Sequence, residues 1–328
     1  MFIGSVEIAS PLVLAPMAGV TDMAFRSVCR DMGAALTCTE LISSRALCYQ
    51  DKKSRQLLQL AENERPGVVQ LFGNDPECMA DAAEIALEAS GADIIDINMG
   101  CPVGKVVSNG DGSALMKDPE KAARIAEAIV RRVKVPVTAK IRRGWDKGSI
   151  NAVEVSKLLE SVGISAIAVH GRTRAQMYTG EADWTLIGEI KKNPRMHIPI
   201  IGNGDIRTPE RAKECFDRYG VDAIMIGRAS FGQPWIFRDV KHYLLNGEPA
   251  TPFTFKECMD ILRTQVRDSV DWLGERPGIL HVRRHLAATP LLKGLPDFRP
   301  LRIAMLRAEK VEELMAIMEE IEKTYGNG

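Results

Sequence analysis

Residues 198–228 read IPIIGNGDIRTPERAKECFDRYGVDAIMIGR. The apolar runs Ile198–Ile201 and Ala223–Ile226 do not alternate with polar residues, which is typical of strands buried on both faces of a parallel sheet. Between them, Thr208 followed by Pro209 predicts a helix start, because threonine caps a helix N-terminus and proline fits the first helical position. The stretch therefore predicts a strand–helix–strand unit.

The same unit recurs through the chain before Phe237. Asp75 with Pro76 and Asp118 with Pro119 mark further helix starts. Six more apolar runs are candidate strands: Leu12–Ala15, Leu36–Thr39, Val68–Leu71, Ile94–Asn98, Val137–Ile141 and Ala166–His170. Eight strands alternating with helices predict an α/β fold of the (β/α)8 TIM barrel class. The alternative is an open doubly wound sheet, which predicts fewer strands and a GxGxxG turn that the sequence lacks.

The pattern changes after Phe237, where strand signals give way to helical periodicity. The turn-rich residues 246–249 separate the two parts, so we expect a barrel domain at residues 1–244 and a C-terminal helical domain at residues 245–328. A single apolar helix face ending near Gly326 is predicted from the spacing of Ile303, Leu306, Leu314, Ile317, Met318 and Ile321.

The composition excludes several classes of protein. The chain has 328 residues, of which 45% are hydrophobic and 26% charged, as in globular proteins. It has no run of about 18 apolar residues and no basic start of a signal peptide, so we expect a cytoplasmic protein without a membrane span. The seven cysteines form no CxxC pair, which favours reduced thiols and no metal site. No obligatory protein partner is indicated.

The net charge of zero hides an uneven distribution. Residues 61–127 contain 5 basic and 13 acidic residues, whereas residues 276–310 contain 8 basic and 2 acidic residues. A basic segment is typical of a surface that faces phosphates, although a solvated helix face has the same composition. His281 and His285 share one predicted helix in this segment. Without the glutamate of an HExxH motif they do not predict zinc, and they favour a basic face for RNA phosphate or a plain solvated helix.

Polar residues and glycines collect where the predicted strands end. The active sites of TIM barrels lie at the C-terminal ends of the strands. Reading those ends in order gives Met17, Glu40, Gln70, Asn98, Cys101, Lys140, Arg142, His170, Asn203, Gly204, Asp205, Gly227 and Arg228. Their convergence at one rim of an apolar cylinder predicts an active site there.

The turns after the last two strands predict a phosphate site. Gly202, Gly204 and Gly227 leave the backbone bare, so that main-chain N–H groups can approach phosphate oxygens, and Arg228 adds charged donors. Two ordinary loop turns are the alternative.

Two further residues favour a polar ligand inside the barrel mouth. Lys140 lies within an apolar strand, where a charged amine is costly unless it meets an anion or a polar ligand. The alternative for Lys140 is a side chain that extends to solvent at the strand end. Gln70 can offer a donor and an acceptor to a buried heterocycle, or it can be a satisfied core amide.

Cys101 is the strongest candidate for a reacting group. A free thiol has a pKa near 8.5, so at neutral pH it can donate a proton as well as attack. Gly100 and Pro102 on either side predict a tight loop that holds the thiol at the rim. An inert core cysteine is the alternative. The sequence suggests no strong histidine partner, which argues against a protease-like nucleophile.

These motifs, in this order, resemble the tRNA-dihydrouridine synthases, particularly the bacterial B-type subfamily. The resemblance spans nearly the whole barrel and is looser in the helical domain. The matching stretches are Ala15–Asp22, Val69–Gly73, Asp96–Pro102, Gly112–Leu115, Ala139–Arg142, His170–Arg174, Gly202–Ile206, Ile224–Arg228 and Pro234–Phe237.

The resemblance implies an FMN cofactor and NADPH, or NADH, as its reductant. The residues that it implies for the flavin are Pro16, Met17, Ala18, Gln70, Lys140 and His170, with Asn203, Gly204, Asp205, Gly227 and Arg228 at the ribityl phosphate. Asn98, Lys140 and Arg142 would face the uracil. By the same resemblance the flavin delivers hydride to C6 of a uridine in tRNA, Cys101 protonates C5, and the helical domain binds the RNA.

Two other functions remain open at this point. An FMN-dependent dehydrogenase of the dihydroorotate or dihydropyrimidine type, acting on a free base, shares an Asn-x-x-Cys-Pro-like loop. It would not need a basic helical domain, so that domain favours RNA. A non-catalytic barrel that binds RNA or phosphate would not need Lys140 and Cys101 together.

Overall fold

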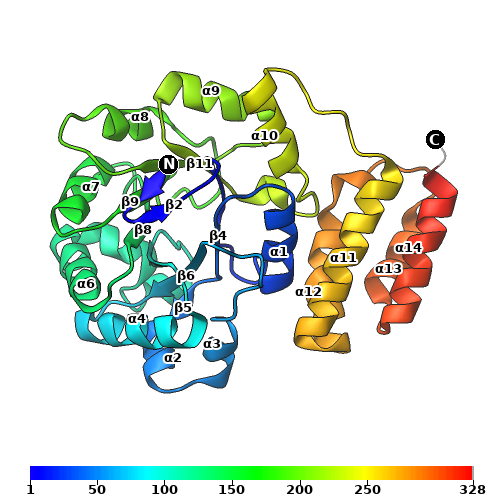
Figure 1. Ribbon diagram of the computed structural model, residues 1–328, viewed down its shortest axis with the longest axis horizontal. Helices are drawn as coiled ribbons and strands as arrows, with labels where there is room; N and C mark the ends of the chain where they lie inside the picture. Colours follow the sequence, from blue (N-terminus) through cyan, green and yellow to red (C-terminus); the bar gives the residue numbers. More distant parts are fainter. Residues whose placement is uncertain (327–328) are drawn as a thin grey trace.

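The computed structural model describes residues 1–326, and its core is a parallel barrel surrounded by helices (Figure 1). Hydrogen-bonded neighbours follow the order β3-β11-β10-β9-β8-β7-β6-β4. A parallel bridge between Val13 and Leu36 joins β3 to the start of β4 and closes the ring. The strands are β3 (Leu12–Leu14), β4 (Thr37–Cys38), β6 (Gly67–Phe72), β7 (Ile94–Met99), β8 (Val137–Arg142), β9 (Ala166–His170), β10 (Ile200–Asn203) and β11 (Ala223–Ile226). The predicted TIM barrel is confirmed, and the open sheet is wrong.

Two strands differ from their predicted bounds in ways that shape the site. The strand predicted at 198–201 runs instead from Ile200 to Asn203, because Pro199 has no N–H to give to the ladder. The shift brings Asn203 into the barrel. The second barrel strand is split, since β5 (Ile42–Ser43) also pairs with β6 and leaves residues 39–41 outside the ladder.

Helices cover the outside of the barrel. They are α1 (Met23–Asp31), α2 (Ser44–Cys48), α3 (Lys52–Gln56), α4 (Pro76–Ser90), α5 (Gly104–Val107), α6 (Pro119–Arg132), α7 (Ala152–Ser161), α8 (Thr185–Lys192), α9 (Pro209–Tyr219) and α10 (Ile236–Asn246), with short 3₁₀ turns η1 (Gly112–Lys117) and η2 (Arg228–Ser230). The predicted caps are present: Asp75, Asp118 and Thr208 each accept a hydrogen bond from a backbone N–H in the first helical turn.

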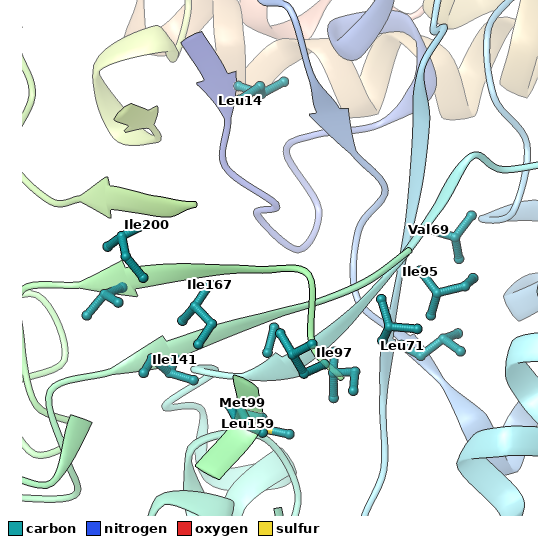
Figure 2. Close-up of a cluster of buried hydrophobic side chains, with 14 of the residues drawn as sticks. Leu14, Val69, Leu71, Ile95, Ile97, Met99, Ile141, Leu159, Ile167 and Ile200 are labelled. Atoms are coloured by element: carbon teal, nitrogen blue, oxygen red, sulfur yellow. The ribbon is translucent and has the colours of Figure 1, made fainter. Parts of the chain in front are cut away.

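Alternation along each strand separates two environments. Outward side chains such as Val69, Ile97 and Ile141 pack against the helices in one apolar cluster (Figure 2). Inward residues at the strand starts form a second cluster, which includes Val68 and Ile94. The antiparallel hairpin β1 (Phe2–Ile3) and β2 (Val6–Glu7) closes this end of the barrel, with Ile3 and Ile8 buried in the same cluster. The opposite end is lined by polar side chains.

The C-terminal helices stand beside the barrel, next to α1 (Figure 1). They are α11 (Phe255–Leu273), α12 (Glu275–Ala288), the 3₁₀ turn η3 (Pro290–Leu292), α13 (Arg299–Arg307) and α14 (Val311–Tyr325). They enclose an apolar cluster of their own that includes Leu262, Val282 and Leu314. The predicted domain boundary at 244–245 lies inside α10, and residues 247–254 lead from α10 to α11. Within residues 1–326, no helix combines the length and the apolar character needed to cross a bilayer.

The prediction of one helix face from Ile303 to Ile321 is wrong. The helix is interrupted at residues 308–310, between α13 and α14, and the Ile303 side chain is 43% exposed. The break is held by Glu275 at the start of α12, whose carboxylate pairs with the Lys310 amine at 2.9 Å and accepts the backbone N–H of Val311 at 3.0 Å. A contact remote in sequence therefore fixes where α14 begins.

Both histidines of α12 contact the barrel. His281 Nδ1 lies 2.6 Å from Asp22 Oδ2, and this hydrogen bond raises the pKa of His281. His285 is fully buried: its ring packs on those of Phe25 and Phe231, with centroids 4.2 and 4.8 Å away, and its Nε2 lies 3.2 Å from the Val20 carbonyl oxygen. The interpretation of His285 as part of a solvated or phosphate-facing helix surface is wrong.

Burial of His285 predicts a specific sensitivity to acid. Burial lowers the pKa of His285 from 6.5 to about 4. Below pH 6.5 the unfolded chain takes up a proton that the folded chain resists, so stability falls as the pH drops from 6.5 towards 4. The loss at pH 4 is on the order of 3 kcal/mol.

Urea unfolding of the wild type and of His285→Phe at pH 7 and pH 4.5 tests this. The variant should lose less stability between the two pH values than the wild type does. Equal losses would contradict the prediction.

Candidate active site

A cavity of about 610 Å³ opens at the C-terminal end of the barrel, within the size range of small-molecule sites. All but one of the predicted ligand and catalytic residues line it: Pro16, Met17, Ala18, Asn98, Cys101, Lys140, Arg142, His170, Asn203, Gly204, Asp205, Gly227 and Arg228. Gln70 is the exception. Parallel strands bring these residues together because their C-terminal ends meet at one rim.

Lys140 points from β8 towards β10. Its Nζ donates a hydrogen bond to Asn203 Oδ1 at 3.1 Å, and Asn203 Nδ2 in turn donates to the Met225 carbonyl at 2.7 Å. Burial, followed by the neighbouring charge of Arg142, lowers the pKa of Lys140 to about 8. Within the part of the chain that the structure describes, the lysine is therefore a desolvated cation with a single hydrogen-bond acceptor, able to hold an anionic or strongly polar ligand group.

His170 ends β9 and is 7% exposed. Burial, then the charges of Lys140 and Arg142, holds its pKa well below the usual value, so the imidazole is neutral at physiological pH. Its Nδ1 is buried and finds no hydrogen-bond partner among residues 1–326. Because buried polar atoms are nearly always paired, this atom is a candidate contact for a polar ligand atom in the cavity.

The loop after β10 is shaped by close backbone approach. Gly204 has φ +125°, and a Cβ there would lie 2.6 Å from the Cβ of Ala182, so only glycine fits. Asp205 accepts hydrogen bonds from Arg172 at 3.1 and 2.7 Å and from Arg228 at 3.1 Å. Burial alone would raise the pKa of Asp205, but the Arg172 hydrogen bond and the nearby cations lower it. The Asp205 carboxylate thus fixes two guanidinium groups, with Arg228 at the cavity.

The loop of Cys101 is held by backbone contacts. Asn98 Oδ1 accepts the N–H groups of Cys101 at 2.9 Å and Gly100 at 3.2 Å, and Ser113 Oγ donates to the Cys101 carbonyl at 2.8 Å. Arg142 Nε donates to the Gly100 carbonyl at 2.7 Å. Burial raises the pKa of Cys101, so at neutral pH the side chain is a protonated thiol and can act as a proton donor.

Gln70 and Glu40 lie outside the cavity lining. Gln70 is fully buried, with its Nε2 donating to Asp96 Oδ2 and its Oε1 accepting from Asn98 Nδ2, each at 2.7 Å. Both polar atoms of the amide are therefore paired within the protein, as in the alternative of a satisfied core amide, and a contact between Gln70 and the flavin stays a prediction. Glu40 lies in the gap between β4 and β5, where it accepts the backbone N–H of Gly19, and burial raises its pKa.

Sequence reasoning missed an aromatic residue at the mouth. Tyr178 lines the cavity and is 53% exposed. The guanidinium carbons of Arg228 and Arg142 lie 5.0 and 5.8 Å from its ring centre. Tyr178 lies on a loop without helical or strand periodicity, so no pattern placed its side chain. Its position shortly after the His170–Arg174 motif was the one sequence feature that pointed to the site.

Comparisons with known proteins agree on one family. Residues 13–325 match the family model described as dihydrouridine synthase. The chain is 44% identical over 312 residues to tRNA-dihydrouridine synthase B of Pseudomonas aeruginosa, covering 94% of this chain and 92% of that protein. It is 44% identical over 289 residues to tRNA-dihydrouridine synthase B of Escherichia coli, covering 88% of each chain. It is 40% identical over 324 residues to a probable tRNA-dihydrouridine synthase of Rickettsia conorii, covering 98% and 96%.

Solved structures share the fold at low sequence identity. The 6-hydroxypseudooxynicotine amine oxidase of Pseudomonas geniculata superposes with a TM-score of 0.59 at 14% identity, over 74% of this chain and 49% of that one. A variant of NCR from Zymomonas mobilis gives 0.54 at 16% identity, over 79% and 93%. At these low sequence identities, the similarity shows a shared barrel fold and nothing more.

Proposed function

The chain belongs to the dihydrouridine synthase family, and on this premise we propose that it reduces specific uridines of tRNA to 5,6-dihydrouridine, with FMN as cofactor and NADPH as reductant. Membership of the family makes the chain a flavin-dependent, tRNA-modifying oxidoreductase. The proposed reaction rests on one observation: the protonated thiol of Cys101 and the desolvated amine of Lys140 line the same cavity.

The residues of the cavity fit a flavin mononucleotide. A phosphate would be held by the bare backbone at Gly204 and Gly227 and by the Arg228 guanidinium that Asp205 orients. The unpaired Nδ1 of His170 and the amine of Lys140 would contact the polar edge of the ring. Pro16, Met17 and Ala18, on the loop after β3, would lie beside the ring.

The chain's own side chains would bind the base and supply the proton. When bound, FMN supplies the hydride for C6 of the uracil. Asn98, Lys140 and Arg142 would orient the base. Arg142 can do so with what remains of its guanidinium, because its Nε and Nη1 already donate to the Gly100, Thr173 and Met177 carbonyls. The Cys101 thiol would then deliver its proton to C5, on a loop that keeps it partly buried.

The helical part of the chain would bind the RNA. Of the basic residues in 276–310, several are exposed: Arg276, Arg284, Lys293, Arg299, Arg302, Arg307 and Lys310. The guanidinium of Arg284 lies over Gly19, on the loop that reaches the cavity, so the basic surface extends to its mouth. We expect phosphate contacts there, and with them a salt-dependent affinity.

The function is tested with purified protein and tRNA from cells that lack dihydrouridine. The protein should be yellow and release FMN on denaturation. With NADPH, digested tRNA should contain a uridine heavier by two hydrogens in mass spectra. Fully modified tRNA should gain nothing. Reduction of free uracil or oxidation of dihydroorotate without any change in tRNA would favour the free-base alternative, and a colourless protein that binds no FMN would refute the proposal.

A further inference from the structure

A chain of hydrogen bonds runs across three neighbouring strands beneath the cavity. Thr138 Oγ1 lies 2.5 Å from Asp96 Oδ1, and Gln70 Nε2 lies 2.7 Å from Asp96 Oδ2. Gln70 Oε1 accepts from Asn98 Nδ2 at 2.7 Å, and Asn98 Oδ1 accepts the N–H of Cys101 at 2.9 Å. The pairing register places Gln70 beside Asp96 and Asp96 beside Thr138, so these inward side chains meet directly. These hydrogen bonds connect Asp96 to the loop that carries Cys101.

The Asp96 carboxylate sets which group donates and which accepts in this series of hydrogen bonds. An ionised carboxylate only accepts hydrogen bonds, so it fixes the NH₂ group of Gln70 towards itself and the carbonyl oxygen of Gln70 towards Asn98. That oxygen in turn fixes the NH₂ group of Asn98. The Asn98 oxygen must then face the backbone of Cys101, where it accepts the N–H. The backbone N–H groups of Gly100 and Cys101 hold Asn98 from the other end, so loss of the carboxylate would free the amide of Gln70 to turn and would leave the NH₂ group of Asn98 without a fixed acceptor.

Stability alone does not explain a carboxylate here. Asp96 is 7% exposed, and among residues 1–326 no cation lies within ion-pair distance of it. Burial raises the pKa of Asp96, opposed by the hydrogen bonds from Thr138 and Gln70 and by the more distant charge of Lys140. A buried carboxyl group without an ionic partner destabilises a fold. An asparagine would cost less to bury, but its amide could face Gln70 either way round.

We propose that Asp96 is a positioning residue, which orients the loop of Cys101 through Gln70 and Asn98. Its importance for catalysis rests on the proposed function, in which Cys101 supplies the proton. The orientation itself is a property of the folded chain and can be measured without RNA or reductant.

The test measures how fast Cys101 reacts with iodoacetamide in the purified protein, resolved by peptide mass spectrometry over a range of pH. Asp96→Leu leaves Gln70 free to turn and loosens the loop. Cys101 should then react about tenfold faster, as expected for one lost hydrogen bond, with its pKa closer to that of a free thiol. Thr138→Val is the matched control, because it removes the other contact of Asp96 and leaves the Gln70 link. Its rate should stay within about twofold of the wild type.

A charge swap separates orientation from packing. Gln70→Glu alone opposes two carboxylates and should raise the reactivity of Cys101 as Asp96→Leu does. Adding Asp96→Asn should restore it, because the carboxylate introduced at position 70 would again offer only acceptors to Asn98. Unchanged reactivity in Asp96→Leu, or failure of the swap to restore it while both proteins stay folded by circular dichroism, would overturn the proposal. The wild type's activity on tRNA is assayed separately. If the proposed function fails, the reactivity of Cys101 towards iodoacetamide still tests the role of Asp96.

Discussion

Replacing Cys101 by alanine is expected to lower dihydrouridine formation in tRNA by at least about 100-fold, which is the usual contribution of a positioned proton donor. Reduction of the bound flavin by NADPH should continue at the wild-type rate, because that step needs no proton from the thiol. The pKa of Cys101 is raised by burial, so the thiol carries its proton over the whole neutral range. Stopped-flow measurement of flavin reduction, and of its reoxidation by tRNA, separates the two steps.

A matched control for this variant is Cys258→Ala. Cys258 is a free thiol like Cys101 and is buried, but it lies on α11 in the C-terminal helices and not at the cavity. It should keep both half-reactions. Loss of flavin reduction in Cys101→Ala would contradict a role limited to proton donation, and full activity on tRNA would remove Cys101 from the reaction.

Lys140→Met is expected to change stability and ligand binding in opposite directions. Burial lowers the pKa of Lys140 from 10.5 to about 8, so holding the charge at pH 7 costs the flavin-free protein on the order of 3 kcal/mol. Methionine removes this cost and should stabilise the flavin-free protein by up to that amount. The same variant should bind FMN at least about tenfold more weakly, because a charged donor is lost.

The pH dependence of stability checks the cause. The folded wild type releases its proton near pH 8 and the unfolded chain near pH 10.5, so the unfolded state holds more protons between these values and wild-type stability rises there. Lys140→Met should lack that rise. Urea unfolding of flavin-free protein at pH 7 and pH 10, with flavin fluorescence titration, measures both effects. Lys53→Met, at an exposed lysine, is the control and should change neither. A destabilised Lys140→Met would contradict the prediction.

Sequence patterns predicted correctly those features that depend on residues close together in the chain, such as helix caps. The caps at Asp75, Asp118 and Thr208 lie where the sequence placed them, because a capping side chain and its N–H partner are three residues apart. Strand bounds moved where a residue such as Pro199 has no N–H to donate to the ladder. The break between α13 and α14 escaped prediction because it depends on Glu275, more than 30 residues away.

Residues 198–228 show which features follow from the sequence and which need the tertiary structure. By itself the sequence determined that residues 198–228 form a strand, a capped helix and a strand, and that eight such strands bring their C-terminal residues to one rim. It determined this because burial pattern, capping and parallel pairing are local or repetitive. Only the tertiary structure decided that Asn203 faces Lys140, that His285 is buried against Phe25, and that Gln70 serves Asp96 and Asn98 beneath the cavity. Those partners come from different strands and helices, and their meeting depends on the register and packing of the whole barrel.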